Sequence, residues 1–139
     1  MSEFKFYFPM QIRYGDLDPQ WHVNNSHTVI FIETARLNYI MALGLFDGQS
    51  FFDLGLIVAD VHVVYLAPIK LTQKIRVGVR VAKIGTKSLT LEYQIEDEAD
   101  GRALTRAETV MVCYDYHKNE SKPVPDEWRA QISAFEGWK

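Results

Sequence analysis

The sequence predicts an α+β domain in which a curled antiparallel sheet of five strands wraps around one long helix. One segment, residues 25–43, is long, apolar and free of glycine and proline. One strand-like segment precedes it and four follow it, several with strict apolar alternation. A single helix covers only one face of such a sheet, so the sheet must curl around it. The remaining face or edge needs a partner, which predicts a homo-oligomer, either a dimer or a dimer of dimers.

The helical segment has clear end signals. Asn24 or Asn25 suits the N-cap, and Gly44 suits the C-terminal stop. We expect about five turns over 25–43. A helix this apolar should be largely surrounded by protein. Its narrow polar stripe consists of Glu33, Arg36 and Asn38.

The strands are expected at 4–13, 57–67, 74–83, 89–96 and 102–116. In the first of them, Pro9 marks an edge or a bulge. Gly85 and the Asp100-Gly101 pair mark turns between the later strands. Residues 47–55 are expected to form a loop, and a short helix is expected at 126–132.

The composition narrows the function classes. The 139 residues suit a single domain, 1–139, and the net charge of −3 gives no support to nucleic-acid binding. The one cysteine, Cys113, allows no intramolecular disulfide and is expected to be buried. No apolar run approaches the ~20 residues of a membrane span, and no signal peptide is visible. We therefore expect a cytoplasmic protein that does not cross a membrane.

A cluster of polar residues, RYGDLDPQWHVNNSH (13–27), stands directly before the apolar helix. Within it, Asp18 lies seven residues before Asn25. A helix start offers free N–H groups and a partial positive charge. The cluster is therefore placed to bring a carboxylate to the positive end of a buried helix.

The ordered motifs of the chain resemble those of the hotdog-fold acyl-CoA thioesterases of the 4-hydroxybenzoyl-CoA thioesterase-like family. The first is a basic residue at the end of the first strand, Arg13, followed by D-x-D at 16–18 and H-V-N-N at 22–25. The helix then carries E-x-x-R at 33–36, and Y-x-x-P follows at 65–68. The resemblance covers almost the whole chain. One departure is Trp21, where many members have glycine, and we expect it to reshape the pocket mouth.

The resemblance implies roles in the hydrolysis of an acyl-CoA thioester. Asp18 would be the catalytic carboxylate, either as base on a water or as nucleophile. The backbone N–H of Asn25 would stabilise the oxyanion, and the Asn25 side chain is a candidate helix cap. His22 would orient the substrate or bond across a subunit interface. Lys87, in the turn KIGTKS, would meet the nucleotide end of coenzyme A, unless it is an ordinary solvated lysine.

The other polar residues of the motifs are interpreted as structural. Asp16 is expected to fix its loop by local hydrogen bonds, and His27 and His62 to be structural. Glu33 has the spacing of an ion pair with Arg36, although some related hotdog enzymes use a helix carboxylate in catalysis. No cofactor is implied. A metal site from residues 16–22 lacks a recognised ligand spacing.

Three alternatives remain. A thioesterase for acyl-carrier protein would need a basic rim, for which Lys70, Lys74, Arg76 and Arg80 are candidates. The hotdog enoyl-thioester hydratases carry a signature of roughly G-D-x-N-P-x-H-x-D. Residues 15–24 are similar to it, but they have one extra residue before His22. They also have Asn24 where the signature ends in aspartate. A non-catalytic acyl-thioester binder is the third.

Overall fold

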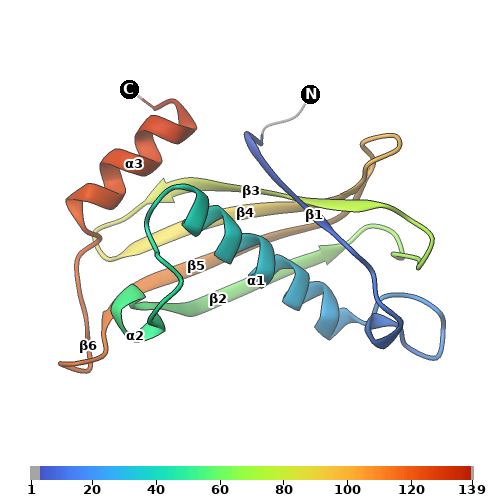
Figure 1. The fold of residues 1–139 in the computed structure, drawn as a ribbon, viewed down its shortest axis with the longest axis horizontal. Coiled ribbons are helices and arrows are strands. Elements are labelled where there is room, and N and C mark those ends of the chain that lie inside the picture. The colour runs from blue at the N-terminus through green and yellow to red at the C-terminus, as the bar shows by residue number, and fades with distance from the viewer. Residues whose placement is uncertain (1–3, 139) are drawn as a thin grey trace.

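The computed structural model describes residues 4–138, and its sheet follows the predicted plan (Figure 1). All neighbouring strands are antiparallel, in the order β1-β3-β4-β5-β2, and β6 pairs with β5. The strands are β1 (Phe6–Met10), β2 (Leu56–Tyr65), β3 (Ile75–Ile84), β4 (Ser88–Asp97), β5 (Ala103–Asp115) and β6 (Glu120–Ser121). The five expected strands are confirmed, although β1 is shorter than 4–13 because the chain turns away after Met10.

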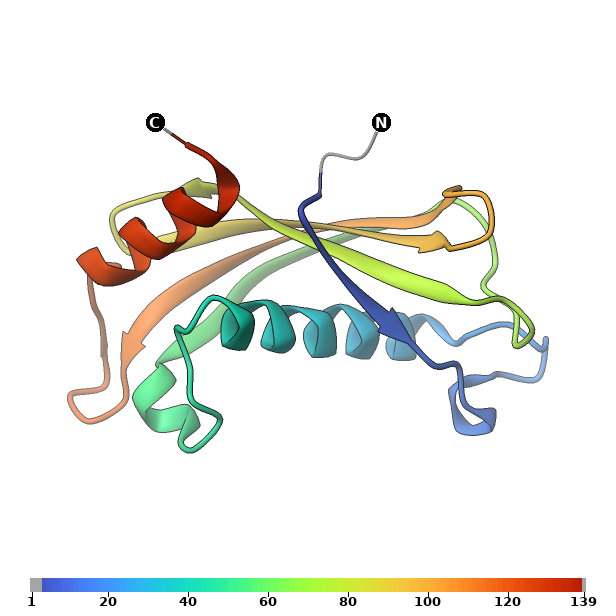
Figure 2. The same cartoon turned by 45° about the horizontal axis from the view of Figure 1, so that its top comes forward.

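Helix α1 (Asn25–Ala42) lies along the concave face of the sheet, as Figures 1 and 2 show. Its buried face includes Phe31, Ile32 and Tyr39, and the alternate residues of β3 and β4 close the core from the other side. Each large apolar side chain buried there contributes about 1.5–3 kcal/mol. The core therefore fixes α1 against the sheet.

One side of α1 remains open in the single chain. Ile30 is 42% exposed and Met41 is 43% exposed. The expectation of a helix largely surrounded by protein is therefore met on one side only. The open side lies toward β2, which is the last strand of the sheet.

The two ends of α1 have local causes. The Asn24 side chain accepts a hydrogen bond from the Ser26 N–H at 2.9 Å, so Asn24 is the N-cap. The alternative that the Asn25 side chain caps the helix is wrong, because Asn25 is already its first residue. After the helix, Gly44 has a φ of 76°, a left-handed conformation that glycine adopts without strain.

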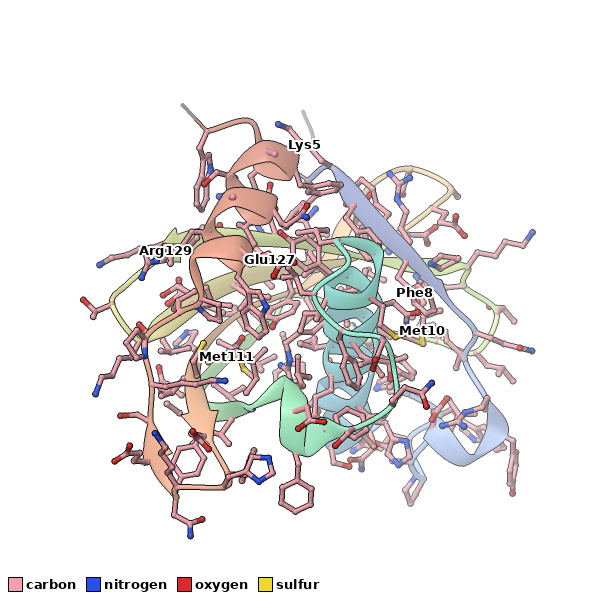
Figure 3. All side chains as sticks on the ribbon, turned by 60° about the vertical axis from the view of Figure 1, so that its left-hand side comes forward. Lys5, Phe8, Met10, Met111, Glu127 and Arg129 are labelled. Atoms are coloured by element: carbon pink, nitrogen blue, oxygen red, sulfur yellow. The ribbon has the colours of Figure 1, made fainter. Side chains whose placement is uncertain are left out.

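Two further helices differ from the prediction. Helix α2 (Phe51–Leu54) occupies part of the expected loop, and its N-cap residue Ser50 makes no side-chain cap hydrogen bond. Helix α3 (Asp126–Glu136) begins where expected and runs four residues beyond residue 132. Its Arg129 donates a hydrogen bond to the carbonyl oxygen of Gly85 at 2.6 Å, which docks α3 beside the β3–β4 turn (Figure 3).

Strand β2 forms an open edge of the sheet. Within residues 4–138 its ladder partner is β5, and no strand pairs with its other side. Its exposed apolar side chains include Val58, Val61 and Val64, each 42–44% exposed. A ten-residue apolar edge of this kind is a template for pairing with another chain.

Candidate active site

The loop before α1 is anchored by a buried carboxylate. The side chain of Asp16 has no exposed surface, and it accepts a hydrogen bond from the Arg13 backbone N–H at 2.7 Å. The Arg13 guanidinium lies 3.1 Å and His27 Nδ1 2.8 Å from its other oxygen. Burial alone would raise the pKa of Asp16, but these hydrogen bonds and the Arg13 charge together lower it. The structural roles expected for Asp16 and His27 therefore fit their contacts.

Asp18 opens a tight hairpin that ends at His22. The Asp18 N–H donates to the His22 carbonyl, and the Trp21 N–H donates to the Asp18 carbonyl, both at 2.9 Å. Residues 19–21 thus form a three-residue hairpin loop, a type that ends in a left-handed residue.

The left-handed residue of this hairpin is Trp21, with a φ of 65°. Glycine takes this conformation freely, whereas another residue bears a cost of about 1–2 kcal/mol. The indole is 68% exposed and lies outside the cavity wall described next. Tryptophan in place of the family's glycine at position 21 therefore affects the backbone conformation of the hairpin. The expected reshaping of the pocket mouth is not evident, because Trp21 does not line the cavity.

A cavity of about 280 Å³ lies between this hairpin, the start of α1 and the end of β2. Asp18, His22 and Asn25 line it together with Tyr65 and Thr105. Three of the four residues singled out from the sequence therefore meet in one place. The cavity is at the lower end of ligand-pocket volumes, so it suits the reacting end of a ligand rather than a whole coenzyme.

Two polar groups of this cavity are available for chemistry. Oδ1 of Asp18 accepts the Gln20 N–H at 2.9 Å, while Oδ2 has no hydrogen-bond partner within residues 4–138. The Asn25 N–H, at the start of α1, likewise has no acceptor in that part of the chain. One carboxylate oxygen and one helix-start donor thus remain for a bound group. The His22 ring makes no hydrogen bond within the same residues.

Two cavity residues were missed as site residues by sequence reasoning. The Tyr65 hydroxyl donates to the Asn25 carbonyl at 3.3 Å and ties the end of β2 to the start of α1. Thr105 Oγ1 is buried without a partner among residues 4–138, a state that costs about 1–3 kcal/mol. Strand alternation places Thr105 on the inward face of β5, which was the available signal.

Lys87, the fourth predicted residue, lies far from this cavity within one chain. Its carbonyl accepts the Cys113 N–H at 2.8 Å, and Cys113 pairs with Leu56 at the beginning of β2. The cavity includes Tyr65 at the other end of β2, roughly 30 Å away along a strand of this length. Figure 1 shows the β3–β4 turn and the start of α1 at opposite ends of the sheet.

A second hollow, a groove of about 390 Å³, runs between α1, α2 and the start of β2. Its apolar wall is formed by Ile30, Leu37, Ile40, Phe51, Leu54, Leu56 and Met111. Glu33 and Arg36 also line it and form the expected ion pair, with an N–O distance of 3.6 Å. The Arg36 guanidinium also donates to the Tyr93 hydroxyl at 3.3 Å. Glu33, whose side chain is 51% exposed, therefore forms the ion pair expected from its spacing.

Two of the four candidates for a basic rim are in ion pairs, whereas Lys70 and Lys74 form none among residues 4–138. Arg76 lies 2.6 Å from a Glu96 carboxylate oxygen, and Arg80 pairs with Glu92. In the described chain, no cluster of three or more His, Cys, Asp or Glu side chains is arranged to hold a metal ion. None of the helices described here has the length and apolar character needed to cross a membrane.

Comparisons with known proteins identify relatives of this chain. A thioesterase from Thermus thermophilus, solved with coenzyme A and zinc, matches with a TM-score of 0.87 and 30% identity over 100% of both chains. The long-chain acyl-CoA thioesterase FadM of Escherichia coli K12 is 23% identical over 88% of this chain and 93% of FadM. A 1,4-dihydroxy-2-naphthoyl-CoA thioesterase from Synechocystis shares the fold, with a TM-score of 0.82 at 18% identity, covering 91% of this chain and 94% of that one.

The family is shown by a sequence model as well. The model of the thioesterase-like superfamily matches residues 12–132, which includes every motif that carried the resemblance. The curled antiparallel sheet around α1 is the hotdog fold expected from those motifs. The chain therefore belongs to the thioesterase-like superfamily and is a thioester hydrolase with the hotdog fold.

Proposed function

We propose that this protein hydrolyses acyl-CoA thioesters, with Asp18 as the catalytic carboxylate and the Asn25 N–H as oxyanion donor. One observation carries the proposal. The same cavity is lined by Asp18, with one carboxylate oxygen unpartnered within residues 4–138, and by the first residue of α1. Thioester hydrolysis needs a base or nucleophile on one side of the carbonyl and a hydrogen-bond donor for the oxygen on the other.

Hydrolysis of the thioester can then follow either of two paths. The thioester oxygen accepts the Asn25 N–H, and the positive end of α1 stabilises the charge that develops there. Asp18 takes a proton from a water whose oxygen bonds to the acyl carbon, or its own oxygen attacks that carbon to form an anhydride that water later cleaves. The C–S bond breaks, and the thiolate leaves and takes up a proton. The products are the free acid and the thiol.

Coenzyme A is the thiol that the comparisons favour. Both FadM and the Thermus enzyme are named for acyl-CoA substrates or bound coenzyme A. A carrier-protein substrate would need an unpaired basic rim. Arg76 and Arg80 are paired with Glu96 and Glu92, which leaves Lys70 and Lys74 as its candidates. The small cavity would hold the thioester group, and the separate apolar groove along α1 is a candidate place for the acyl chain.

We further propose that two copies pair through their β2 edges, as the open apolar edge and the exposed side of α1 both need a partner. Antiparallel pairing of β2 with β2 reverses the strand direction. It would bring Lys87 of the partner subunit to the Asp18 end, where it can meet the nucleotide phosphates. The predicted cytoplasmic location stays a prediction.

Thiol release from a panel of short, long, branched and aromatic acyl-CoAs tests the proposed substrate class. We expect release from at least one group of these esters, at a kcat/KM of about 10⁴ M⁻¹s⁻¹ or more. The same acyl groups on acyl-carrier protein and a trans-2-enoyl-CoA serve as comparisons. Faster release from the carrier protein would replace coenzyme A as the substrate, and loss of the enoyl double bond without thiol release would indicate a hydratase.

A further inference from the structure

The groove along α1 contains a buried cation whose hydrogen bonds are incomplete. Arg36 lines this groove, and its side chain is only 10% exposed. A guanidinium carries five N–H donors. Among residues 4–138, that of Arg36 makes one hydrogen bond, from Nη1 to the Tyr93 hydroxyl at 3.3 Å. The Glu33 carboxylate lies 3.6 Å from Nη2, which is an ion pair but too long for a hydrogen bond.

The edge of the guanidinium formed by Nε and Nη2 is therefore available to a ligand. These two nitrogens point N–H groups the same way, and such a fork binds a carboxylate through two parallel hydrogen bonds. Nε makes no hydrogen bond to any of residues 4–138. It also keeps accessible surface, because Thr105 Oγ1 is the one side-chain atom in that part of the chain that is fully buried without a partner. Since Arg36 lines the groove, a group in the groove can reach this edge.

The rest of the groove fits an apolar chain. Apart from Glu33, Thr34 and Arg36, all of its lining side chains are apolar. Its volume of about 390 Å³ lies within the range of small-molecule pockets. A well-matched ligand therefore combines an apolar chain with a group that accepts two hydrogen bonds from a guanidinium. A carboxylic acid has this composition, and hydrolysis of a thioester releases a carboxylic acid.

We propose that the groove binds a free carboxylic acid, with its carboxylate on the Nε–Nη2 edge of Arg36 and its chain along the apolar wall. This binding goes beyond the proposed hydrolysis and does not involve Asp18. The Glu33 side chain is 51% exposed and makes no hydrogen bond to Nη2, so it can turn toward solvent when the ligand arrives. The ligand carboxylate then has the shorter, two-bonded contact with a cation that is largely shielded from water.

Calorimetric titration of the full-length wild type with sodium decanoate tests the binding without any change to the protein. Octanoate and 1-decanol serve as comparisons. We expect decanoate to bind about 10-fold more tightly than octanoate, because two more methylene groups are buried. We expect 1-decanol to bind about 10-fold or more weakly than decanoate, because its hydroxyl cannot take up both N–H groups of the fork as an ion.

Two variants test the carboxylate position. Glu33→Gln should bind decanoate about 5-fold more tightly, because it removes a like charge beside the ligand carboxylate. The matched control Glu127→Gln removes the same charge from an exposed position on α3 (Figure 3) and should leave the affinity unchanged. Arg36→Lys keeps the charge but lacks the fork and should weaken binding about 10-fold or more, with its melting temperature as the check on folding.

Each result has a distinct meaning. A wild type that does not bind decanoate would overturn the inference, including the case in which a second copy of the chain fills the groove. Equal affinities for decanoate and 1-decanol would overturn the role of Arg36, and so would weaker binding by Glu33→Gln. The titration requires no turnover. A protein that binds decanoate but releases no thiol from any acyl-CoA would therefore overturn the proposed function and leave this inference standing.

Discussion

At the scale of single residues, two aspartates two positions apart have opposite surroundings. Asp16 is fully buried, and both of its carboxylate oxygens are occupied by Arg13 and His27. Asp18 is half-buried and keeps one oxygen unpartnered within residues 4–138. The first arrangement stabilises the loop, and the second leaves a carboxylate for chemistry.

Replacing Asp16 by Asn should reveal the stabilising role through its pH dependence. The pKa of Asp16 is lower in the folded chain than in the unfolded chain. The ionised form therefore stabilises the fold above the ordinary Asp pKa of about 4, and this stability is lost as the pH falls through the folded-state pKa. We expect Asp16→Asn to cost about 1–3 kcal/mol at pH 7.

Thermal unfolding from about pH 7 to about pH 3 measures this effect. The difference in stability between wild type and Asp16→Asn should shrink toward the acid end, since protonation removes from the wild type the charge that the variant already lacks. A difference that stays constant across this range would contradict the assigned role.

The residue scale also shows what the sequence can and cannot predict. The family resemblance singled out Asp18, His22 and Asn25, and these three residues line one cavity. The sequence left two candidates for the N-cap, because Asn24 and Asn25 suit that position equally. The backbone conformation identifies Asn24 as the N-cap. Alternation along β5 gives the face of Thr105, but whether its hydroxyl has a partner depends on residues distant in the chain.

At the scale of elements, α3 completes an edge that β1 leaves open. Strand β1 pairs with β3 only from Ile75 to Val79. Beyond that point the Val81 N–H donates to the Glu136 carboxylate at 3.2 Å, and the same oxygen accepts the Tyr39 hydroxyl at 2.5 Å. Burial, and then the Glu136 carboxylate, raise the pKa of Tyr39 above its ordinary range, so its hydroxyl stays a donor. A short helix was expected at 126–132, but this edge contact was not visible in the sequence.

Replacing Glu136 by Ala should therefore destabilise the fold without affecting catalysis. The change leaves a backbone N–H and a tyrosine hydroxyl without their acceptor, which we expect to cost about 2 kcal/mol or more. Thermal unfolding should show a melting temperature about 6 °C lower. The rate of thiol release at a temperature where both proteins are folded should be unchanged. The Asp18 cavity lies at the start of α1, and α3 lies at the opposite end of the sheet from that point (Figure 1).

The exposed Gln131 on the same helix supplies the control. Gln131→Ala should leave the melting temperature within about 1 °C of the wild type, as surface changes usually do. If Glu136→Ala behaved like Gln131→Ala, the carboxylate would not be holding α3 to the edge of β3.

At the scale of the whole molecule, the distance between Lys87 and Asp18 requires a second copy if both serve one substrate. Within one chain they lie at opposite ends of β2, roughly 30 Å apart by strand length. Sequence alone gave the residues and the need for an oligomer, but the separation of the two ends follows only from the sheet order. Strand β2, the last of that order, is the surface where the second copy would pair.

Mixing two variants, each of which lacks one of these residues, tests whether a site is formed from both subunits. An Asp18→Asn subunit paired with a Lys87→Ala subunit contains one complete site, with Asp18 from one copy and Lys87 from the other. After co-refolding, about half of the dimers are mixed, so we expect about a quarter of the wild-type rate at substrate concentrations below KM. A rate equal to the average of the two separate variants would mean that Lys87 does not act across the interface.

The central claim is that Asp18 performs the chemistry at the start of α1, and thiol release by wild type and Asp18→Asn tests it most directly. Asparagine keeps an oxygen to accept the Gln20 N–H, so the hairpin should persist and the melting temperature should stay within a few degrees. The account predicts that the variant loses about 10²-fold or more in kcat on the best acyl-CoA. A folded Asp18→Asn protein that releases thiol at the wild-type rate would contradict it.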